Sequence, residues 1–183
     1  MMMKKLFACV ILCALCVSSG FTLRCPWIDQ KFKQYSEETV KLLDNMVKNS
    51  TNTSIELDLA FPHHMYERAS KAPAEEKLGF LVQVLNEVFA LFEEDHTDAH
   101  WDEKKVNDFL NVLSRQAAEL NACIKRKLHI KKHKNLHHYF QRLSSNVLEL
   151  KNHSSEAWEI TRKEVKVHLL NVDLVASALV PII

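Results

Sequence analysis

The stretch of sequence that decides the fold class runs from Glu103 to Ile124 and reads EKKVNDFLNVLSRQAAELNACI. Its apolar side chains recur every three or four residues, which is the spacing of one face of an α-helix. The residues on this face are Val106, Phe109, Leu110, Leu113, Ala117, Leu120 and Ile124. We therefore predict an amphipathic helix that begins near Asp102 and packs this face into a core.

Glycine and proline, the residues that most often interrupt helices, are scarce in the whole chain. The 183 residues include 2 glycines and 4 prolines, whereas average composition would give roughly 13 glycines. Neither residue occurs between Phe80 and Val180, so nothing there forces the backbone out of helix. The scarcity excludes glycine-rich phosphate loops and dinucleotide-binding fingerprints, and it disfavours all-β folds with many tight turns. The sequence thus predicts an all-α protein.

The same periodicity predicts four more helices, which makes five main helices in all. They cover residues 26–48, 73–92, 136–150 and the region after Ser154 or Ser155, either of which can cap the last helix. The expected core residues of the first three are Ile28, Phe32, Tyr35, Leu42, Leu43 and Met46; Leu78, Leu81, Leu85, Val88 and Phe92; and Leu136, Tyr139, Phe140, Leu143, Val147 and Leu150.

Residues 49–72 are predicted to form a long connection without a main helix. Antiparallel neighbours in a simple bundle are usually joined by 2–8 residues, so this connection favours a crossover between parallel helices, as in up-up-down-down bundles. Within it, Ile55–Leu59 could form a short strand, but we favour an apolar strap across the bundle.

The last helix is predicted to carry two apolar stripes. Its expected core face consists of Trp158, Val165, Leu169, Val172, Ala176 and Leu179, which fall within about 100° of one another. The opposite side carries Ile160, Val167, Leu170 and Leu174, with Lys163 among them. Single exposed aliphatic side chains are normal on protein surfaces, but a stripe along one outward face is better explained by a partner.

The first twenty residues have the features of a secretory signal peptide. Lys4 and Lys5 precede an apolar run over residues 6–17, and Ser18-Ser19-Gly20 suits a cleavage site. The run is shorter than the ~20 residues that span a bilayer, and the alternative is a buried N-terminal helix. We expect residues 1–20 to be removed and residues 21–183 to form a single helical domain outside the cell.

Removal of residues 1–20 would leave Cys25 and Cys123 as the remaining cysteines. Such a pair is expected to form a disulfide in an oxidising compartment, and two free thiols are the alternative. The bridge would close a loop of about 100 residues and stabilise the fold by about 4–5 kcal/mol in the chain-entropy model. N-glycosylation sequons, which also fit an extracellular protein, begin at Asn49, Asn52 and Asn152.

Patterns that could carry chemistry or bind a metal are weak. His129, His133 and His137 are spaced to lie on one helix face, as zinc ligands can be, but lysines and an arginine crowd residues 125–134 and would repel a dication. We interpret residues 125–138 as a solvated basic connector, with weak attraction to glycosaminoglycans as an alternative. The near-neutral chain gives no indication of nucleic-acid binding. We expect no enzyme activity, no cofactor and no metal.

Four segments follow one another along the chain: Cys25-Pro-Trp27, Phe109–Gln116 with Leu120 and Cys123, Tyr139-Phe-Gln-Arg-Leu143, and Ala157-Trp-Glu-Ile-Thr-Arg162. In this order they resemble the type I interferons, and the similarity is greatest to the two-cysteine group of fish type I interferons. Mammalian relatives usually have a cysteine of a second bridge where this chain has Glu156. Its absence agrees with the two-cysteine group.

This resemblance implies a fold and a function. The fold is a four-helix-bundle class II helical cytokine with long crossover connections. The implied function is that of a secreted monomer that binds and bridges two class II cytokine receptor chains at the cell surface, activates JAK–STAT signalling and induces an antiviral state, without stable membrane insertion. The alternatives are another helical cytokine or a secreted amphipathic helical lipid-binding protein.

The resemblance also implies which residues contact a receptor chain. In the family, the helix that carries the Ala-Trp-Glu motif contributes its following arginine and residues just beyond it. Carried over to this sequence, these are Arg162, Lys163, Lys166, Val167 and Leu170. Relatives often have arginine at the position of Val167, so we expect a more apolar contact here.

Overall fold

The computed structural model describes residues 25–47, 59–124 and 132–179, and all regular elements in these ranges are helical. The α-helices are α2 (Lys33–Asn45), α3 (His63–Lys71), α4 (Ala74–Phe92), α5 (Glu103–Ala122), α6 (Lys134–Leu143) and α7 (Ser155–Ser177). Shorter elements are the π-helical turns η1 (Ile28–Phe32) and η4 (Ser144–Leu148) and the 3-10 turns η2 (Thr97–Ala99) and η5 (Glu149–Lys151). The predicted all-α fold is confirmed.

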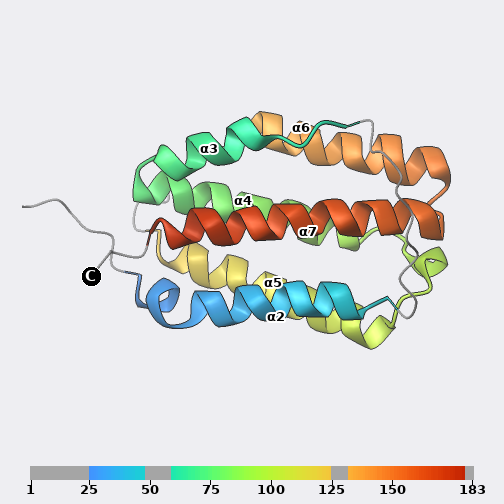
Figure 1. The fold of residues 1–183 in the computed structure, drawn as a ribbon, viewed down its shortest axis with the longest axis horizontal. Coiled ribbons are helices and arrows are strands. Elements are labelled where there is room, and N and C mark those ends of the chain that lie inside the picture. The colour runs from blue at the N-terminus through green and yellow to red at the C-terminus, as the bar shows by residue number, and fades with distance from the viewer. Residues whose placement is uncertain (1–24, 48–58, 125–131, 180–183) are drawn as a thin grey trace, which may run out of the picture.

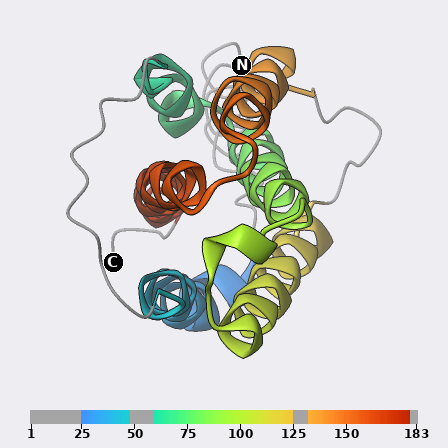
Figure 2. The same cartoon turned by 90° about the vertical axis from the view of Figure 1, so that its right-hand side faces the viewer.

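Helices α2, α4, α5 and α7 form a four-helix bundle in which α5 and α7 each contact both α2 and α4. Helices α2 and α4 run in one direction and α5 and α7 in the other (Figure 1), which is the up-up-down-down order. The end-on view shows α7 with α2 on one side and with α3 and α6 on the other (Figure 2). The predicted crossover between parallel helices is confirmed.

The crossover contains a helix that the sequence analysis did not predict. Helix α3 lies in its second half, packs against α4 and α7, and buries Tyr66 and Ala69. The expectation of a connection without a main helix was wrong, because nine residues give too short a pattern and such helices depend on tertiary packing. The predicted signal peptide at residues 1–20, Asn49, Asn52 and most of the expected strap lie outside the described residues.

Helix starts follow local sequence signals. Pro73 precedes α4, and Glu75 and Glu76 lie in its first turn, where the helix dipole favours carboxylates. The side chain of Asp102 accepts a hydrogen bond from the Lys105 N–H, at 3.3 Å, and caps α5. At the start of α7 the cap is Ser154, whose hydroxyl accepts a bond from the Ala157 N–H.

The core contains most of the side chains that periodicity places there, with two corrections. Leu150 was expected inside but is 77% exposed, while Leu148 is fully buried. The cause is the π-helical turn η4, which adds a residue to the turn and shifts the register of the following side chains. Ile160 was expected on the outward stripe but is buried, because α2, α4, η2 and η4 surround the first turns of α7.

A disulfide joins Cys25, at the start of the first helix, to Cys123, just after α5, with the two Cα atoms 5.5 Å apart. The predicted bridge is therefore present. Nearby, the Gln116 amide donates a buried hydrogen bond to the Thr39 hydroxyl and adds a second link between α5 and α2. Both links fix the position of the helix that carries one side of the face described below.

Two helix junctions turn through left-handed backbone without using glycine. His100, between η2 and α5, has φ of 55°, and Asn152 and His153, between η5 and α7, have φ of 51° and 52°. Glycine adopts this conformation at the lowest cost. The glycine among the described residues, Gly79, lies instead inside α4.

Candidate functional site

The outward side of α7 carries a strip of exposed apolar residues. Val167, Leu170 and Leu174 are 38%, 47% and 68% exposed, and their spacing places them on one side of the helix. The other large apolar side chain of comparable exposure among residues 25–47, 59–124 and 132–179 is Leu150, in the turn η5. The apolar stripe predicted from periodicity is confirmed for these three residues.

A hollow of about 420 Å³ separates this strip from α2. Its lining from α2 is mostly polar, and α7 contributes Leu170 and Asp173. The residues of the lining are Ser36, Glu37, Val40, Lys41, Asp44, Asn45, Leu170 and Asp173. We call the combined surface of this hollow and the apolar strip the α2–α7 face.

One edge of the α2–α7 face is held by an ion-pair cluster centred on Arg162. Its guanidinium donates two hydrogen bonds to the Glu159 carboxylate, at 2.8 and 2.9 Å. It also donates to the backbone oxygen of Leu43 and to Asp44 Oδ1, both at 3.3 Å. Arg162 therefore ties α7 to the last turns of α2. Because the side chain is only 8% exposed, little of it is available to a partner.

The charges of this cluster are stabilised by one another. Burial alone would raise the pKa of the Glu159 carboxyl, but the hydrogen bonds and charge of Arg162, with a contribution from Lys163, lower it. The hydrogen bonds with Glu159 likewise raise the pKa of Arg162 against the opposing effect of burial. Both groups are therefore ionised at neutral pH.

Two lysines present their charges to solvent beside the cluster. Lys163 Nζ lies 3.5 Å from Glu159 Oε1, and Lys166 Nζ lies 2.6 Å from Asp44 Oδ2. Their side chains are 44% and 38% exposed. Four of the five residues carried over from the resemblance, Lys163, Lys166, Val167 and Leu170, are thus exposed together, whereas Arg162 lies beneath them.

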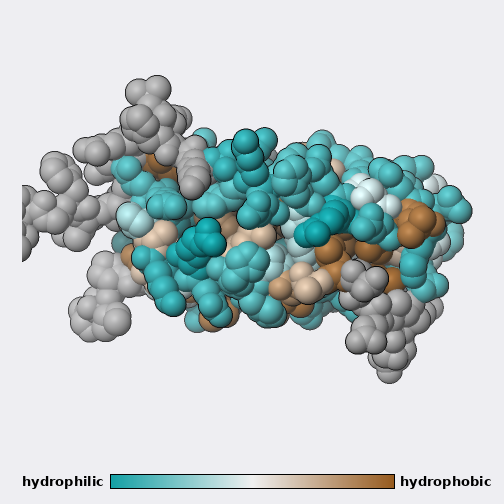
Figure 3. Space-filling view, turned by 90° about the horizontal axis from the view of Figure 1, so that it is seen from above, coloured by the Kyte–Doolittle hydropathy of each residue, from teal (hydrophilic) through white to brown (hydrophobic). Residues whose placement is uncertain are grey.

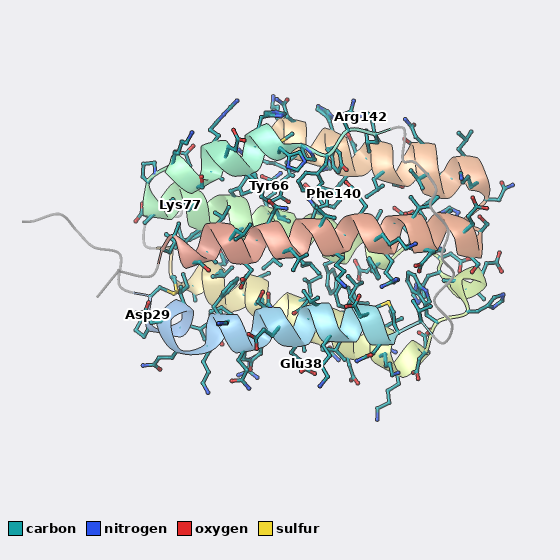
Figure 4. The ribbon with its side chains drawn as sticks, viewed as in Figure 1. Asp29, Glu38, Tyr66, Lys77, Phe140 and Arg142 are labelled. Carbon is teal, nitrogen blue, oxygen red and sulfur yellow. A yellow bond between two sulfur atoms is a disulfide. The ribbon has the colours of Figure 1, made fainter. Side chains whose placement is uncertain are left out.

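A second polar cluster lies on the buried side of the same helix. The Tyr66 hydroxyl from α3 hydrogen-bonds to His168 Nδ1, and the Tyr139 hydroxyl from α6 donates to Glu164. Figure 4 shows Tyr66 between α3 and α7, and Phe140 from α6 also packs on the His168 ring. Burial lowers the pKa of His168 to about 3 and raises that of Glu164. This cluster joins the outer helices to the bundle.

The predicted basic and histidine-rich stretch is only partly described. His129 lies outside the described residues, and the His137 ring contacts Glu87 at 3.0 Å. Within residues 25–47, 59–124 and 132–179, no group of three or more His, Cys, Asp or Glu side chains could hold a metal ion. Across the same ranges, no helix is long and apolar enough to cross a membrane.

Comparison with known proteins gives the family. The sequence model of the Interferon alpha/beta domain matches residues 28–179. The chain is 33% identical to interferon a3 of the trout Oncorhynchus mykiss over 171 residues, which cover 93% of this chain and 95% of the trout protein. The chain belongs to the interferon alpha/beta family.

Other relatives agree with this family and extend it to the fold. Zebrafish interferon 1 has a structure that superposes with a TM-score of 0.74 at 30% identity, over 85% of this chain and 100% of that one. Zebrafish interferon 2, at 20% identity and a TM-score of 0.60, shares the fold. Sheep interferon tau-5 is 27% identical over 156 residues. The identity to the trout and zebrafish proteins places the chain among the fish type I interferons.

Family membership decides between the functional alternatives. Interferons are cytokines and not enzymes, so this chain is an interferon-like cytokine, as the resemblance implied. The lipid-binding alternative and the other helical cytokine classes are not supported.

The sequence analysis missed the contribution of α2 to the α2–α7 face. Asp44 stands on the polar side of its helix, and its partners Arg162 and Lys166 lie more than a hundred residues later. Nothing local marks such a pairing. The Glu159–Arg162 and Glu159–Lys163 pairs, by contrast, have the i,i+3 and i,i+4 spacing that predicts contact on a helix.

Proposed function

We propose that this interferon-family protein is secreted as a monomer and binds two class II cytokine receptor chains, one of them through the α2–α7 face. Bridging the two chains would activate JAK–STAT signalling and an antiviral state. The observation that carries the proposal is the exposed apolar strip of Val167, Leu170 and Leu174, flanked by Lys163 and Lys166. A contiguous exposed apolar surface with a polar rim is typical of protein interaction sites.

The chemistry of the face indicates how it would bind. Leu170 borders both the strip and the hollow, so it occupies the centre, where anchor residues of interfaces tend to lie. Lys163 and Lys166 stand at the edge and would steer a receptor chain with a complementary acidic rim. Arg162 would act as a positioning residue that holds α2 and α7 in register beneath the contact surface.

The test is STAT phosphorylation in cells of the same species, treated with purified secreted protein. Leu170→Asp should reduce potency by 10-fold or more, because a charge at an apolar anchor costs about 2 kcal/mol or more of binding. Leu150→Asp is the matched control, since Leu150 is equally apolar and more exposed but lies away from the face. Equal potency of the two variants would remove the α2–α7 face from the receptor site.

We also propose that Asn152 carries an N-linked glycan. Its side chain is exposed at the turn before α7, as a glycan requires. Enzymatic deglycosylation of secreted protein should produce a mass shift that is smaller in Asn152→Gln, and an unchanged shift in that variant would contradict the proposal.

A further inference from the structure

A second hollow, of about 370 Å³, lies where α3, α4 and the start of α6 meet. Its floor is apolar and consists of Met65, Ala69, Ala72 and Phe80. Its rim is polar and consists of His64, Arg68, Glu76, Lys132, His133, Lys134 and Asn135. We call it the α3–α6 cleft. The side of the molecule seen from above in Figure 1, where α3 and α6 lie, is mostly hydrophilic (Figure 3).

The rim of this cleft carries an excess of positive charge. Arg68 comes from α3, and Lys132 and Lys134 lie at the start of α6. All three side chains are exposed, and none forms an ion pair with a carboxylate within the part of the chain that the structure describes. The carboxylate of the lining is that of Glu76. A cleft lined by one sign of charge concentrates ligands of the opposite sign.

The placement of these cations favours a polymer over a small anion. They stand on the rim, on two segments far apart in the sequence, and do not converge on a buried point. Glu76 would repel a single phosphate or sulfate held at the centre. A flexible polyanion can instead pass along the rim and meet Arg68, Lys132 and Lys134 with successive charged groups.

We propose that the α3–α6 cleft binds sulfated glycosaminoglycan chains. The proposal rests on the proposed secretion for its compartment, because sulfated polysaccharides are the abundant flexible polyanions outside cells. The planar guanidinium of Arg68 can donate two hydrogen bonds to one sulfate group, and the two lysines act as point charges. The near-neutral charge of the whole chain means that attraction depends on this local cluster.

The location of the cleft gives the binding a consequence. Helices α3 and α6 lie on one side of α7, and α2 lies on the other (Figure 1). A polysaccharide bound in the α3–α6 cleft would therefore leave the α2–α7 face open. The protein could be retained in the matrix close to secreting cells while it still meets a receptor.

The experiment compares two triple variants in binding to immobilised heparin at several salt concentrations. The cleft variant is Arg68→Gln/Lys132→Gln/Lys134→Gln, and its matched control is Lys31→Gln/Lys33→Gln/Lys104→Gln, which removes three exposed charges elsewhere. We expect the cleft variant to bind about 10-fold more weakly or worse. The slope of log affinity against log salt concentration should also be smaller in magnitude by about 2, because three fewer cationic contacts release fewer counterions on binding. The control should stay close to wild type.

Several outcomes would overturn the proposal. These are equal weakening in both triple variants, no binding of the wild type, or equally strong binding to unsulfated hyaluronan, to phosphatidylserine vesicles or to single-stranded DNA. Circular dichroism checks that helicity is kept, and the single variants Arg68→Gln and Lys134→Gln replace the triple variant if it is not. STAT phosphorylation by the cleft variant should equal that of the wild type, so a failure of the receptor proposal is seen separately.

Discussion

The two polar clusters on α7 differ in the charge of their central residue although they share one helix. Arg162 is charged, whereas His168 is uncharged at neutral pH. The Arg162 cluster, with Glu159 and Asp44, is ionised and lies at the edge of the α2–α7 face. The His168 cluster, with Tyr66, Glu164 and Tyr139, is enclosed between α7 and the outer helices α3 and α6. The comparison shows how one helix can hold a compensated charge in one place and keep a histidine uncharged in another.

The difference follows from the partners that each group meets. Arg162 is buried, but it donates two hydrogen bonds to the Glu159 carboxylate and one to Asp44, so its charge is compensated. The His168 ring is fully buried among aromatic rings, and within the described residues its Nε2 makes no hydrogen bond. Glu164 Oε1 lies 3.9 Å from that nitrogen. That distance is too long for a hydrogen bond, and burial of the ring makes a charge on His168 costly.

The largest effect is expected when one partner of the charged cluster is removed. Arg162→Met leaves the Glu159 carboxylate, whose side chain is 7% exposed, with Lys163 as its remaining cation in the structure. The free energy of unfolding should fall by about 3–5 kcal/mol, as when a buried ion pair is broken. Urea denaturation measures this change. A loss below about 1 kcal/mol would show that the ion pair contributes no more than a solvent-exposed pair does.

The double variant Glu159→Met/Arg162→Met is the companion experiment. It should recover most of the lost stability, because apolar side chains of similar volume often replace a buried ion pair at little cost. It also separates the roles of Arg162. If Arg162 only positions α2 and α7, the double variant signals nearly as well as the wild type, whereas a 10-fold loss of potency at equal stability would make Arg162 a receptor contact.

A smaller effect is expected at the His168 cluster when the pH is lowered. The unfolded chain binds a proton at His168 near its ordinary pKa of about 6.5, whereas the folded protein does so only near pH 3. Acid therefore favours the unfolded state across this window, and stability should fall by about 2 kcal/mol between pH 7 and pH 5 from this group. The raised pKa of Glu164 acts in the opposite direction.

His168→Gln isolates the contribution of the imidazole. Denaturation of the wild type and of this variant at pH 7 and pH 5 gives the change in the free energy of unfolding with pH for each protein. The contributions of Glu164 and the other carboxyl groups largely cancel when the two changes are subtracted. Tyr66→Phe keeps the buried imidazole and should keep most of the pH dependence. An identical pH dependence in wild type and His168→Gln would mean that the ring is reached by solvent.

The smallest effect is expected at the exposed pair that shares Asp44 with Arg162. Lys166 is bonded to the Asp44 carboxylate, but both side chains are more than a third exposed. Lys166→Met should therefore change stability by less than about 1 kcal/mol, and the change should shrink further at high salt. The same denaturation experiment measures it, and a loss as large as that of Arg162→Met would erase the distinction between the buried and exposed parts of the cluster.

The sequence predicts those parts of the molecule that depend on neighbours along the chain. The starts of α4, α5 and α7 lie at Pro73, Asp102 and Ser154 because prolines and capping side chains act within one turn. The exposed strip on α7 follows from helical spacing alone. Leu150 was misplaced because the π-helical turn before it interrupts that spacing.

The parts that could not be predicted depend on contacts between distant segments. Helix α3 is stable because it packs on α4 and α7, and Tyr66 meets His168 across 102 positions of sequence. Periodicity does not specify which polar residue on one helix faces which on another. For the same reason the α2 side of the α2–α7 face is visible only in three dimensions, as is the placement of Arg68 beside Lys132 and Lys134 around the α3–α6 cleft.

The left-handed turns at His100 and at Asn152–His153 matter for engineering the protein. A residue with a β-carbon in this conformation costs roughly 1–2 kcal/mol. Glycine would remove this cost, but part of the gain would be lost because glycine makes the unfolded chain more flexible. The exposed His100 lies outside both the α2–α7 face and the α3–α6 cleft. Replacing His100 with glycine, at the junction before α5, should therefore raise the thermal stability of the protein without altering either binding surface.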